Sequence, residues 1–172
     1  MQVFVTGFGP FGRHKENPSQ RLAESYAPDS IVLDVSYDAA KAWVDGFDPS
    51  PYDAIVLTGV ATNRKHTSLE LFARNHRALT QDNAGSSILG DLVEGGELLI
   101  TSTLWTPERV ARLASHEVHA SLNAGAYLCN AISYWALMRW PDRLVGFLHL
   151  PDPQFVPIPE TVAAARALIA RL

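Results

Sequence analysis

The sequence contains one cysteine, Cys129, among 172 residues. A lone cysteine excludes an intramolecular disulfide and a multi-cysteine zinc site, so nothing here requires an oxidising compartment. No run approaches the roughly 18 consecutive apolar residues of a membrane span. The N-terminal stretch MQVFVTGFG also lacks the basic region and apolar core of a secretory signal. We therefore expect a cytoplasmic location and no membrane association.

An excess of positive charge is also missing. The chain has 14 Lys and Arg against 18 Asp and Glu, for a net charge of -4. This balance gives no electrostatic basis for binding nucleic acid. With 47% hydrophobic residues, the composition is that of an ordinary globular protein. The length predicts a single catalytic domain spanning residues 1–172.

Short apolar runs alternate with helical patterns along the chain. Runs rich in valine and isoleucine predict buried strands over 2–6, 31–35, 53–58, 118–122 and 144–150. Helices are expected over 21–26, 107–116, 127–140 and 159–171. Such alternation indicates an α/β fold, with helices on both faces of a largely parallel sheet.

Two further segments complete this description of the chain. Asn17 followed by Pro18 is the start signal of the first helix, since asparagine caps free N–H groups and proline suits the first helical position. The segment 74–96 has no clear periodicity and is long for a connection in a compact domain. It is expected to be a mobile loop or a short hairpin.

Cys129 follows a turn that contains Ala124 and Gly125, near the start of the helix expected over 127–140. Most lone cysteines are small hydrophobic residues that fill a core. At a helix N-terminus, however, the macrodipole and free N–H groups favour the thiolate. The same N–H groups could stabilise an oxyanion, so a nucleophilic role stands beside the packing role.

A cysteine nucleophile needs a base, and His149 is the best placed of the six histidines. It ends an apolar strand in GFLHLP and should project from the same sheet edge as the cysteine turn. His116 and His119 are expected at the surface. Glu70 is an acid within an alternating apolar stretch, so it is either exposed on an edge or paired.

The first loop, TGFGPFG, contains glycines at positions 7, 9 and 12 that superficially resemble a phosphate-binding loop. A G-x-G-x-x-G loop must open directly into a helix, and here Pro10 and a polar stretch intervene before Asn17. Nucleotide binding is therefore disfavoured. Phe8 and Phe11 suit the walls of a small apolar pocket, unless both simply pack beneath the loop.

Taken together, these stretches resemble the pyroglutamyl peptidase I family, also called pyrrolidone carboxylate peptidases. The resemblance runs in the family's order through VTGFGPFGRHKENPS, residues 59–75, DNAG, STL, NAGAYLCN and finally GFLHLP. It implies a three-layer α/β/α sandwich with a largely parallel, mixed sheet. It also implies removal of an N-terminal pyroglutamyl residue from peptides without metal or cofactor, by a protein that often forms tetramers.

The resemblance implies Cys129 as nucleophile, His149 as general base and then acid, and Glu70 as the carboxylate that orients the imidazole. The residues that it implies for substrate binding are Phe8, Phe11, Val60, Tyr127, Leu128 and Arg64. Of these, the two phenylalanines would hold the pyrrolidone ring, and Arg64 would lie at the oxyanion or the scissile carbonyl.

Three features depart from the family pattern. The usual glycine-rich run before the arginine is replaced by Ala-Thr-Asn at 61–63, and Leu71 stands where an arginine is common. The spacing from Cys129 to His149 is shorter than is typical. Two other functions stay open: a cysteine amidase acting on a related lactam or amide, and a pyroglutamate-binding homologue with weak or no catalysis.

Overall fold

The structure is a computed structural model that describes residues 1–172. It contains eight strands and five helices. In chain order they are β1 (Val3–Phe8), α1 (Pro18–Glu24), β2 (Ser30–Leu33), α2 (Tyr37–Gly46), β3 (Ala54–Val60), β4 (Thr67–Glu70), β5 (Phe72–Arg74), β6 (Leu99–Thr101), α3 (Pro107–Leu113), β7 (Val118–Ser121), α4 (Leu128–Arg139), β8 (Leu144–Leu150) and α5 (Ile158–Ile169).

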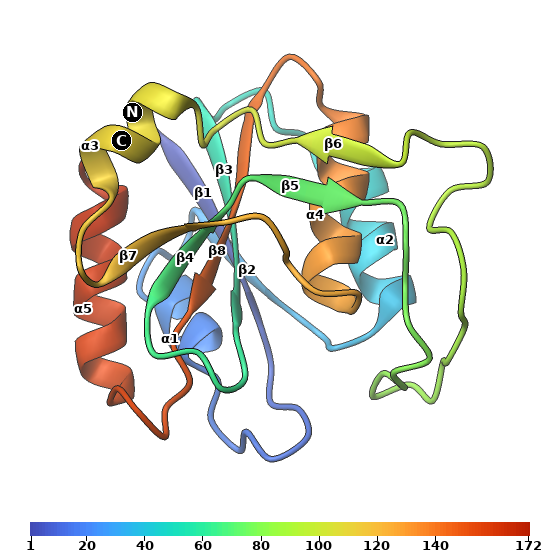
Figure 1. Ribbon diagram of the computed structural model, residues 1–172, viewed down its shortest axis with the longest axis horizontal. Coiled ribbons are helices and arrows are strands. Elements are labelled where there is room, and N and C mark those ends of the chain that lie inside the picture. The colour runs from blue at the N-terminus through green and yellow to red at the C-terminus, as the bar shows by residue number, and fades with distance from the viewer.

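Six strands form the central sheet in the order β2-β1-β3-β8-β4-β7 (Figure 1). The first four of these strands are mutually parallel. β4 runs antiparallel to β8 and parallel to β7. The sheet is therefore mostly parallel and mixed, as expected. Ligand sites in such sheets form beyond the carboxyl ends of parallel strands, here the ends of β1, β3 and β8.

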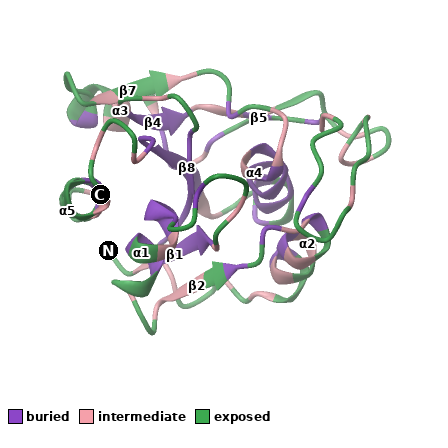
Figure 2. Ribbon diagram, turned by 90° about the horizontal axis from the view of Figure 1, so that it is seen from below, coloured by how far each residue is buried: buried purple, intermediate pink, exposed green.

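Helices cover both faces of this sheet, and each face has its own hydrophobic core (Figure 2). One core joins the sheet to α2 and α4. The other joins the opposite face to α1, α3 and α5. This three-layer arrangement confirms the predicted fold class. None of the helices has the length and apolar character required to cross a membrane.

Several predicted boundaries need small corrections. α1 begins at Pro18, directly after the Asn17 cap that the sequence indicates, where the Asn17 side chain accepts a hydrogen bond from the Ser19 N–H, and it ends at Glu24, two residues before the predicted end. α3 ends at Leu113, three residues before the predicted end, where Ala114 leaves the helical conformation. β8 has the predicted bounds.

The irregular segment after residue 74 belongs to a hairpin. β5 and β6 pair antiparallel, and the chain between them makes a long excursion at the side of α4 and α2 (Figure 1). Asn75, at the start of this excursion, holds the returning chain, because its Oδ1 accepts hydrogen bonds from the N–H groups of Leu92 and Val93. Asp82, further along the excursion, attaches it to α2 by accepting a hydrogen bond from the N–H of Tyr37.

Candidate active site

Strand register brings Glu70 and His149 to one face of the sheet. In the antiparallel pair, Glu70 lies opposite Phe147, so His149 is its diagonal neighbour. Diagonal neighbours in a sheet are within reach of long side chains. His149 Nδ1 and Glu70 Oε1 are 2.7 Å apart, and the two side chains are 5% and 1% exposed. Glu70 is therefore a paired, buried acid, and the alternative of an exposed strand edge is wrong.

This hydrogen bond determines the state of the imidazole. An ionised carboxylate can only accept, so Nδ1 carries the proton that Glu70 binds. In the neutral ring, Nε2 is then left as the acceptor. His149 is thus held in the tautomer that a general base for a neighbouring thiol requires.

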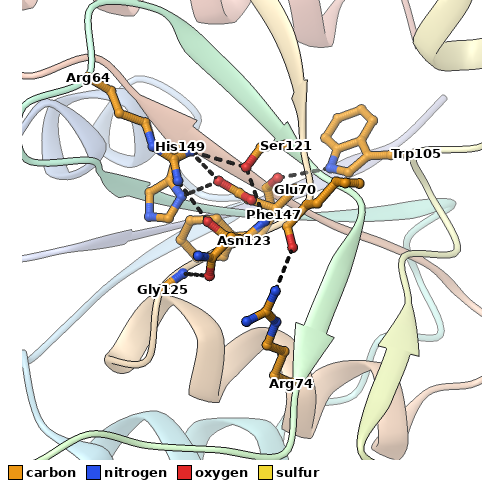
Figure 3. A network of polar contacts seen from close by, with 10 residues as sticks. Arg64, Glu70, Arg74, Trp105, Ser121, Asn123, Gly125, Phe147 and His149 are labelled. Carbon is orange, nitrogen blue, oxygen red and sulfur yellow. Dashed lines mark hydrogen bonds and ion pairs between the residues drawn. The ribbon is translucent and has the colours of Figure 1, made fainter.

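Arg64 joins the pair from the loop after β3. Its Nη1 donates to Glu70 Oε1 at 2.5 Å and lies 3.4 Å from Ser121 Oγ. Its Nη2 donates to the carbonyl oxygen of Asn123 at 2.7 Å. Figure 3 shows the guanidinium between the carboxylate and the segment that leads into α4. Arg64 therefore couples Glu70 to the chain that carries Cys129.

Cys129 is the second residue of α4, as the sequence predicts. The turn before it is shaped by Gly125, which has a φ of 84° and whose N–H donates to Asn123 Oδ1. Tyr127 occupies the N-cap position without a side-chain cap. The first-turn N–H groups of α4 are therefore not used by a capping side chain and remain suited to an oxyanion.

The sulfur of Cys129 lies over the sheet at Gly59. A methyl group added at Gly59 would lie 2.8 Å from Sγ and 2.9 Å from the ring of Phe147. Gly59 pairs directly with His149 in the register of β3 and β8. The sulfur of Cys129 therefore lies over Gly59, whose register partner on β8 is His149, and only glycine leaves room for the thiol there.

Burial and charge set the protonation states. Burial raises the pKa of Cys129 to about 12, and the charge of Glu70 acts in the same direction. Burial lowers the pKa of His149, although the hydrogen bond to Glu70 opposes this shift. Burial also works against ionisation of Glu70, but the bond from His149 and the charge of Arg64 leave its pKa below the usual value. The resting site holds a neutral thiol, a neutral imidazole and a carboxylate.

The residues expected to bind substrate lie around the same strand ends. Val60 ends β3 and is buried, while Leu128 starts α4 and is 1% exposed. Phe11 and Tyr127 are half-buried, with ring centroids 6.4 Å apart. Phe8 is 3% exposed and belongs to the core between the sheet and α2 and α4. Phe11 and Tyr127 are thus the aromatic rings that retain accessible surface.

The loop after β1 does not offer its N–H groups to a phosphate. The N–H of Phe8 donates to Ser19 Oγ, that of Gly9 to the Leu33 carbonyl, and that of Phe11 to the His14 carbonyl. No group of three or more His, Cys, Asp or Glu side chains converges as metal ligands do.

Sequence reasoning missed two contributors to the site. Gly59 forms the floor beneath the thiol, and its signal was a glycine within an otherwise β-branched and apolar strand. Asn123 supplies the carbonyl that Arg64 binds, and a backbone acceptor has no sequence signal. The side-chain hydrogen bonds of Arg64 go to Glu70, to Ser121 Oγ and to the Asn123 carbonyl.

Comparison with known proteins identifies the family of this chain. The family model for pyroglutamyl peptidase matches residues 1–168. This chain belongs to the pyroglutamyl peptidase family. Family membership confirms the predicted resemblance.

Individual members of the pyroglutamyl peptidase family are similar over nearly the whole chain. The pyrrolidone-carboxylate peptidase of Pyrococcus furiosus is 32% identical over 88% of this chain and 81% of that protein. The Lacticaseibacillus paracasei protein of the same name is 32% identical over 99% and 94%. The crystal structure of pyrrolidone carboxyl peptidase from Thermus thermophilus matches with a TM-score of 0.87 and 30% identity, over 99% of this chain and 100% of the other.

Proposed function

We propose that this protein is a pyroglutamyl peptidase that removes an N-terminal pyroglutamyl residue from peptides through a thioester acyl-enzyme. One observation carries the proposal: the only cysteine, at the N-terminus of α4, has its sulfur over Gly59, the strand partner of His149 in the buried Glu70–His149 pair. Membership of the pyroglutamyl peptidase family gives the substrate class. In this assignment Cys129 is the nucleophile, His149 the base and Glu70 the orienting acid.

The first half-reaction begins with proton transfer from Cys129 Sγ to His149 Nε2. The sulfur attacks the scissile carbonyl carbon, which joins the pyroglutamyl group to the next residue, and the oxygen of that carbonyl takes up the negative charge. First-turn N–H groups of α4 stabilise that oxyanion. Because the resting thiol and imidazole are neutral, ionisation accompanies attack, and Glu70 stabilises the imidazolium as it forms.

The first half-reaction ends when the tetrahedral intermediate collapses to a thioester, as the peptide amine leaves with the proton held on His149 Nε2. The second half-reaction uses the same groups, with water in place of the thiol. His149 then takes a proton from water, and the resulting hydroxide attacks the thioester carbonyl. Return of that proton to the sulfur releases free pyroglutamate and restores Cys129.

The pyrrolidone ring would bind beside these groups. A pyroglutamyl group has no free amine, so a site must hold a flat, neutral lactam by apolar contact and backbone hydrogen bonds. We expect Phe11 and Tyr127 to contact such a ring, since their own rings are 6.4 Å apart and only half-buried, and we expect the buried residues Phe8, Val60 and Leu128 to support the pocket. We assign Arg64 to Glu70 and the α4 approach rather than to the oxyanion, on the basis of its bonds.

Three broader features belong to the same proposal. Residues 1–172 act as one catalytic domain, supported by a sheet whose strands come from residue 3 through residue 150 and by packing between α1 and α5. A cytoplasmic location suits a catalytic thiol that must stay reduced. A homo-oligomer, such as a tetramer, is an expectation from the resemblance.

The decisive test is hydrolysis of a pyroglutamyl fluorogenic amide by the purified protein, with and without a thiol alkylator. Hydrolysis that alkylation abolishes would support the proposal. A parallel panel of prolyl and glutaminyl amides distinguishes the other candidates. Turnover of those amides instead would indicate a different cysteine amidase, and binding of pyroglutamate without turnover would indicate a non-catalytic homologue.

A further inference from the structure

A buried carboxylate outside the triad lies in the loop after β8. Asp152 follows His149 by three positions and is 2% exposed. A buried charge is costly unless it is paired and hydrogen-bonded, so its partners show what it holds in place. These partners come from the loops that follow β1 and β3, at the same edge of the sheet as the candidate triad.

The bonds of Asp152 connect those loops directly. Its Oδ2 accepts from Arg13 Nη2 at 2.6 Å and from the N–H of Asn63 at 2.9 Å. Its own N–H donates to the carbonyl oxygen of Arg64 at 2.9 Å. Gln154 adds its N–H to Oδ1 at 3.1 Å and its Nε2 to Oδ2 at 3.0 Å. Asp152 thus binds the N–H of Asn63 and the carbonyl oxygen of Arg64, which lie on either side of the Asn63–Arg64 dipeptide.

Asn63 itself requires such support. It has a φ of 67° and is the sole non-glycine residue with a positive φ. Asparagine tolerates this left-handed conformation better than most residues, but the conformation is still unfavourable and persists only where surrounding contacts hold it. Asn63 Oδ1 also accepts from Arg13 Nη2 at 3.3 Å and from Gln154 Nε2 at 3.2 Å.

The neighbouring residue carries this support into the triad. Because the Arg64 backbone is fixed by Asp152, its side chain leaves the loop in a defined direction, toward Glu70 and the Asn123 carbonyl. Glu70 in turn orients His149, and Asn123 belongs to the turn before Cys129. Hydrogen bonds therefore connect Asp152, through Arg64, to Glu70 and to the Asn123 carbonyl in the segment that precedes Cys129.

Resting on the proposed peptidase function, we propose that Asp152 is a positioning residue that holds Arg64 against Glu70 and against the turn before Cys129. It acts through Arg64 and touches neither the thiol nor the imidazole. Burial raises the pKa of Asp152, but bonds from Asn63, Gln154 and Arg13 outweigh it and leave the pKa below the usual value. Asp152 is therefore ionised and able to hold these donors at neutral pH.

A double-mutant cycle tests whether Asp152 acts through Arg64. Asp152→Asn should lower kcat/KM for the pyroglutamyl amide by about 10- to 100-fold, mostly in kcat, since small displacements of positioning groups have effects of that size. Arg64→Ala should lower it at least as much, and the double variant should match Arg64→Ala alone. Asp142→Asn, an exposed acid before β8, is the control and should behave like wild type.

Near-normal activity of Asp152→Asn would overturn the proposal, and so would a double variant whose loss is the product of the single losses. Thermal unfolding of each variant checks that it folds. If Asp152→Asn does not fold, Arg13→Gln replaces it, because that side chain is 55% exposed and its loss leaves the Asn63 bond in place. Arg13→Gln should also lower kcat, by a smaller factor than Asp152→Asn.

A second readout needs no substrate. The charges that act on the His149 imidazole are the negative charge of Glu70 and the positive charge of Arg64. Loss of the Asp152 charge would by itself lower the pKa of His149, whereas release of Arg64, whose charge lowers that pKa, would raise it. NMR titration, assigned with His149→Gln, should show a raised pKa in Asp152→Asn.

The positioning role of Asp152 and the proposed peptidase function can be contradicted independently of each other. A lowered or unchanged His149 pKa in Asp152→Asn would overturn the positioning role even if the wild-type enzyme is fully active. If the wild-type protein instead fails to hydrolyse pyroglutamyl amides, the proposed function fails, and the direction of the titration shift still decides whether Asp152 acts through Arg64.

Discussion

The candidate site has two sides that are built differently. The catalytic side, made of Glu70, His149 and Arg64, is held by hydrogen bonds of 2.5 to 2.7 Å, two of them between side chains and one from Arg64 to the backbone carbonyl of Asn123. The binding side, made of Phe11 and Tyr127, is half-buried and lies on loops and a helix end. The first side can fix a reaction geometry, and the second offers apolar surface to a ring.

This difference predicts how mutations divide between kinetic parameters. A group whose interaction is made only in the transition state affects kcat, whereas a group that holds substrate and transition state equally affects KM. Substitutions on the catalytic side should therefore lower kcat with little change in KM. Those on the binding side should raise KM.

The largest expected effect is that of Cys129→Ala, which removes the nucleophile and should abolish turnover. The fold should remain, since the change leaves at most a small void. Cys129→Ser should also be nearly inactive, because a hydroxyl is far less acidic than a thiol. Amide hydrolysis and thermal unfolding are the measurements. More than a few per cent of wild-type activity in the alanine variant would contradict the mechanism.

Glu70→Gln should have the next largest effect. It keeps the shape of the side chain but removes the charge that orients His149 and stabilises its protonated form, so we expect kcat to fall by about 10- to 1,000-fold. Glu24→Gln is the control, because Glu24 lies on α1 with a side chain that is 42% exposed. Equal rates for the two variants would reduce the catalytic group to Cys129 and His149.

The pH dependence sharpens the description of the catalytic side. His149 acts as a base only when neutral, and burial lowers its pKa, so activity should persist below pH 6.5 and fall only as the pH drops through that lowered value. The pKa of Cys129 is about 12, so alkylation of the free enzyme by iodoacetamide should still accelerate above pH 9. An alkylation rate that levels off near pH 7 would indicate a preformed thiolate instead.

The sequence predicted those parts of the site that depend on local pattern. β8 has the predicted bounds because Pro151 ends its apolar run. Cys129 lies at a helix start because the turn before it separates α4 from the preceding strand. The burial of Glu70 was not predictable from its own surroundings, since acids are mostly exposed. Its partner His149 is 79 positions away, and the antiparallel β4–β8 pairing that joins them has no local signal.

The hairpin strands and Asp152 were beyond sequence reasoning for related reasons. β5 and β6 have only three residues each, too few to show a period of two. Asp152 looks like any loop acid, and its role depends on backbone N–H and C=O groups of a distant loop. Tertiary contacts of backbone atoms leave no trace in residue type.

On the binding side, Phe11→Ala should raise KM for the pyroglutamyl amide by about tenfold, from lost burial and ring contact, with kcat within a few-fold. Phe8→Ala is a poorer test, since truncating a buried phenylalanine costs about 3 to 5 kcal/mol of stability. Measured KM and kcat for Phe11→Ala decide the matter. An unchanged KM would mean that Phe11 only packs beneath its loop.

The smallest expected effect is that of Tyr127→Phe. The Tyr127 hydroxyl donates to the carbonyl oxygen of Gln81 at 3.2 Å, in the excursion between β5 and β6, so it is already used by the protein. Its loss removes one partly exposed hydrogen bond, worth about 1 kcal/mol of stability, and leaves the ring in place beside Phe11. KM and kcat should both stay within about twofold of wild type, while Tyr127→Leu, which removes the ring, should raise KM. Steady-state kinetics and thermal unfolding separate the two. A tenfold fall in kcat for Tyr127→Phe would show that the hydroxyl acts on the reacting group, and Tyr127 would then belong to the catalytic side.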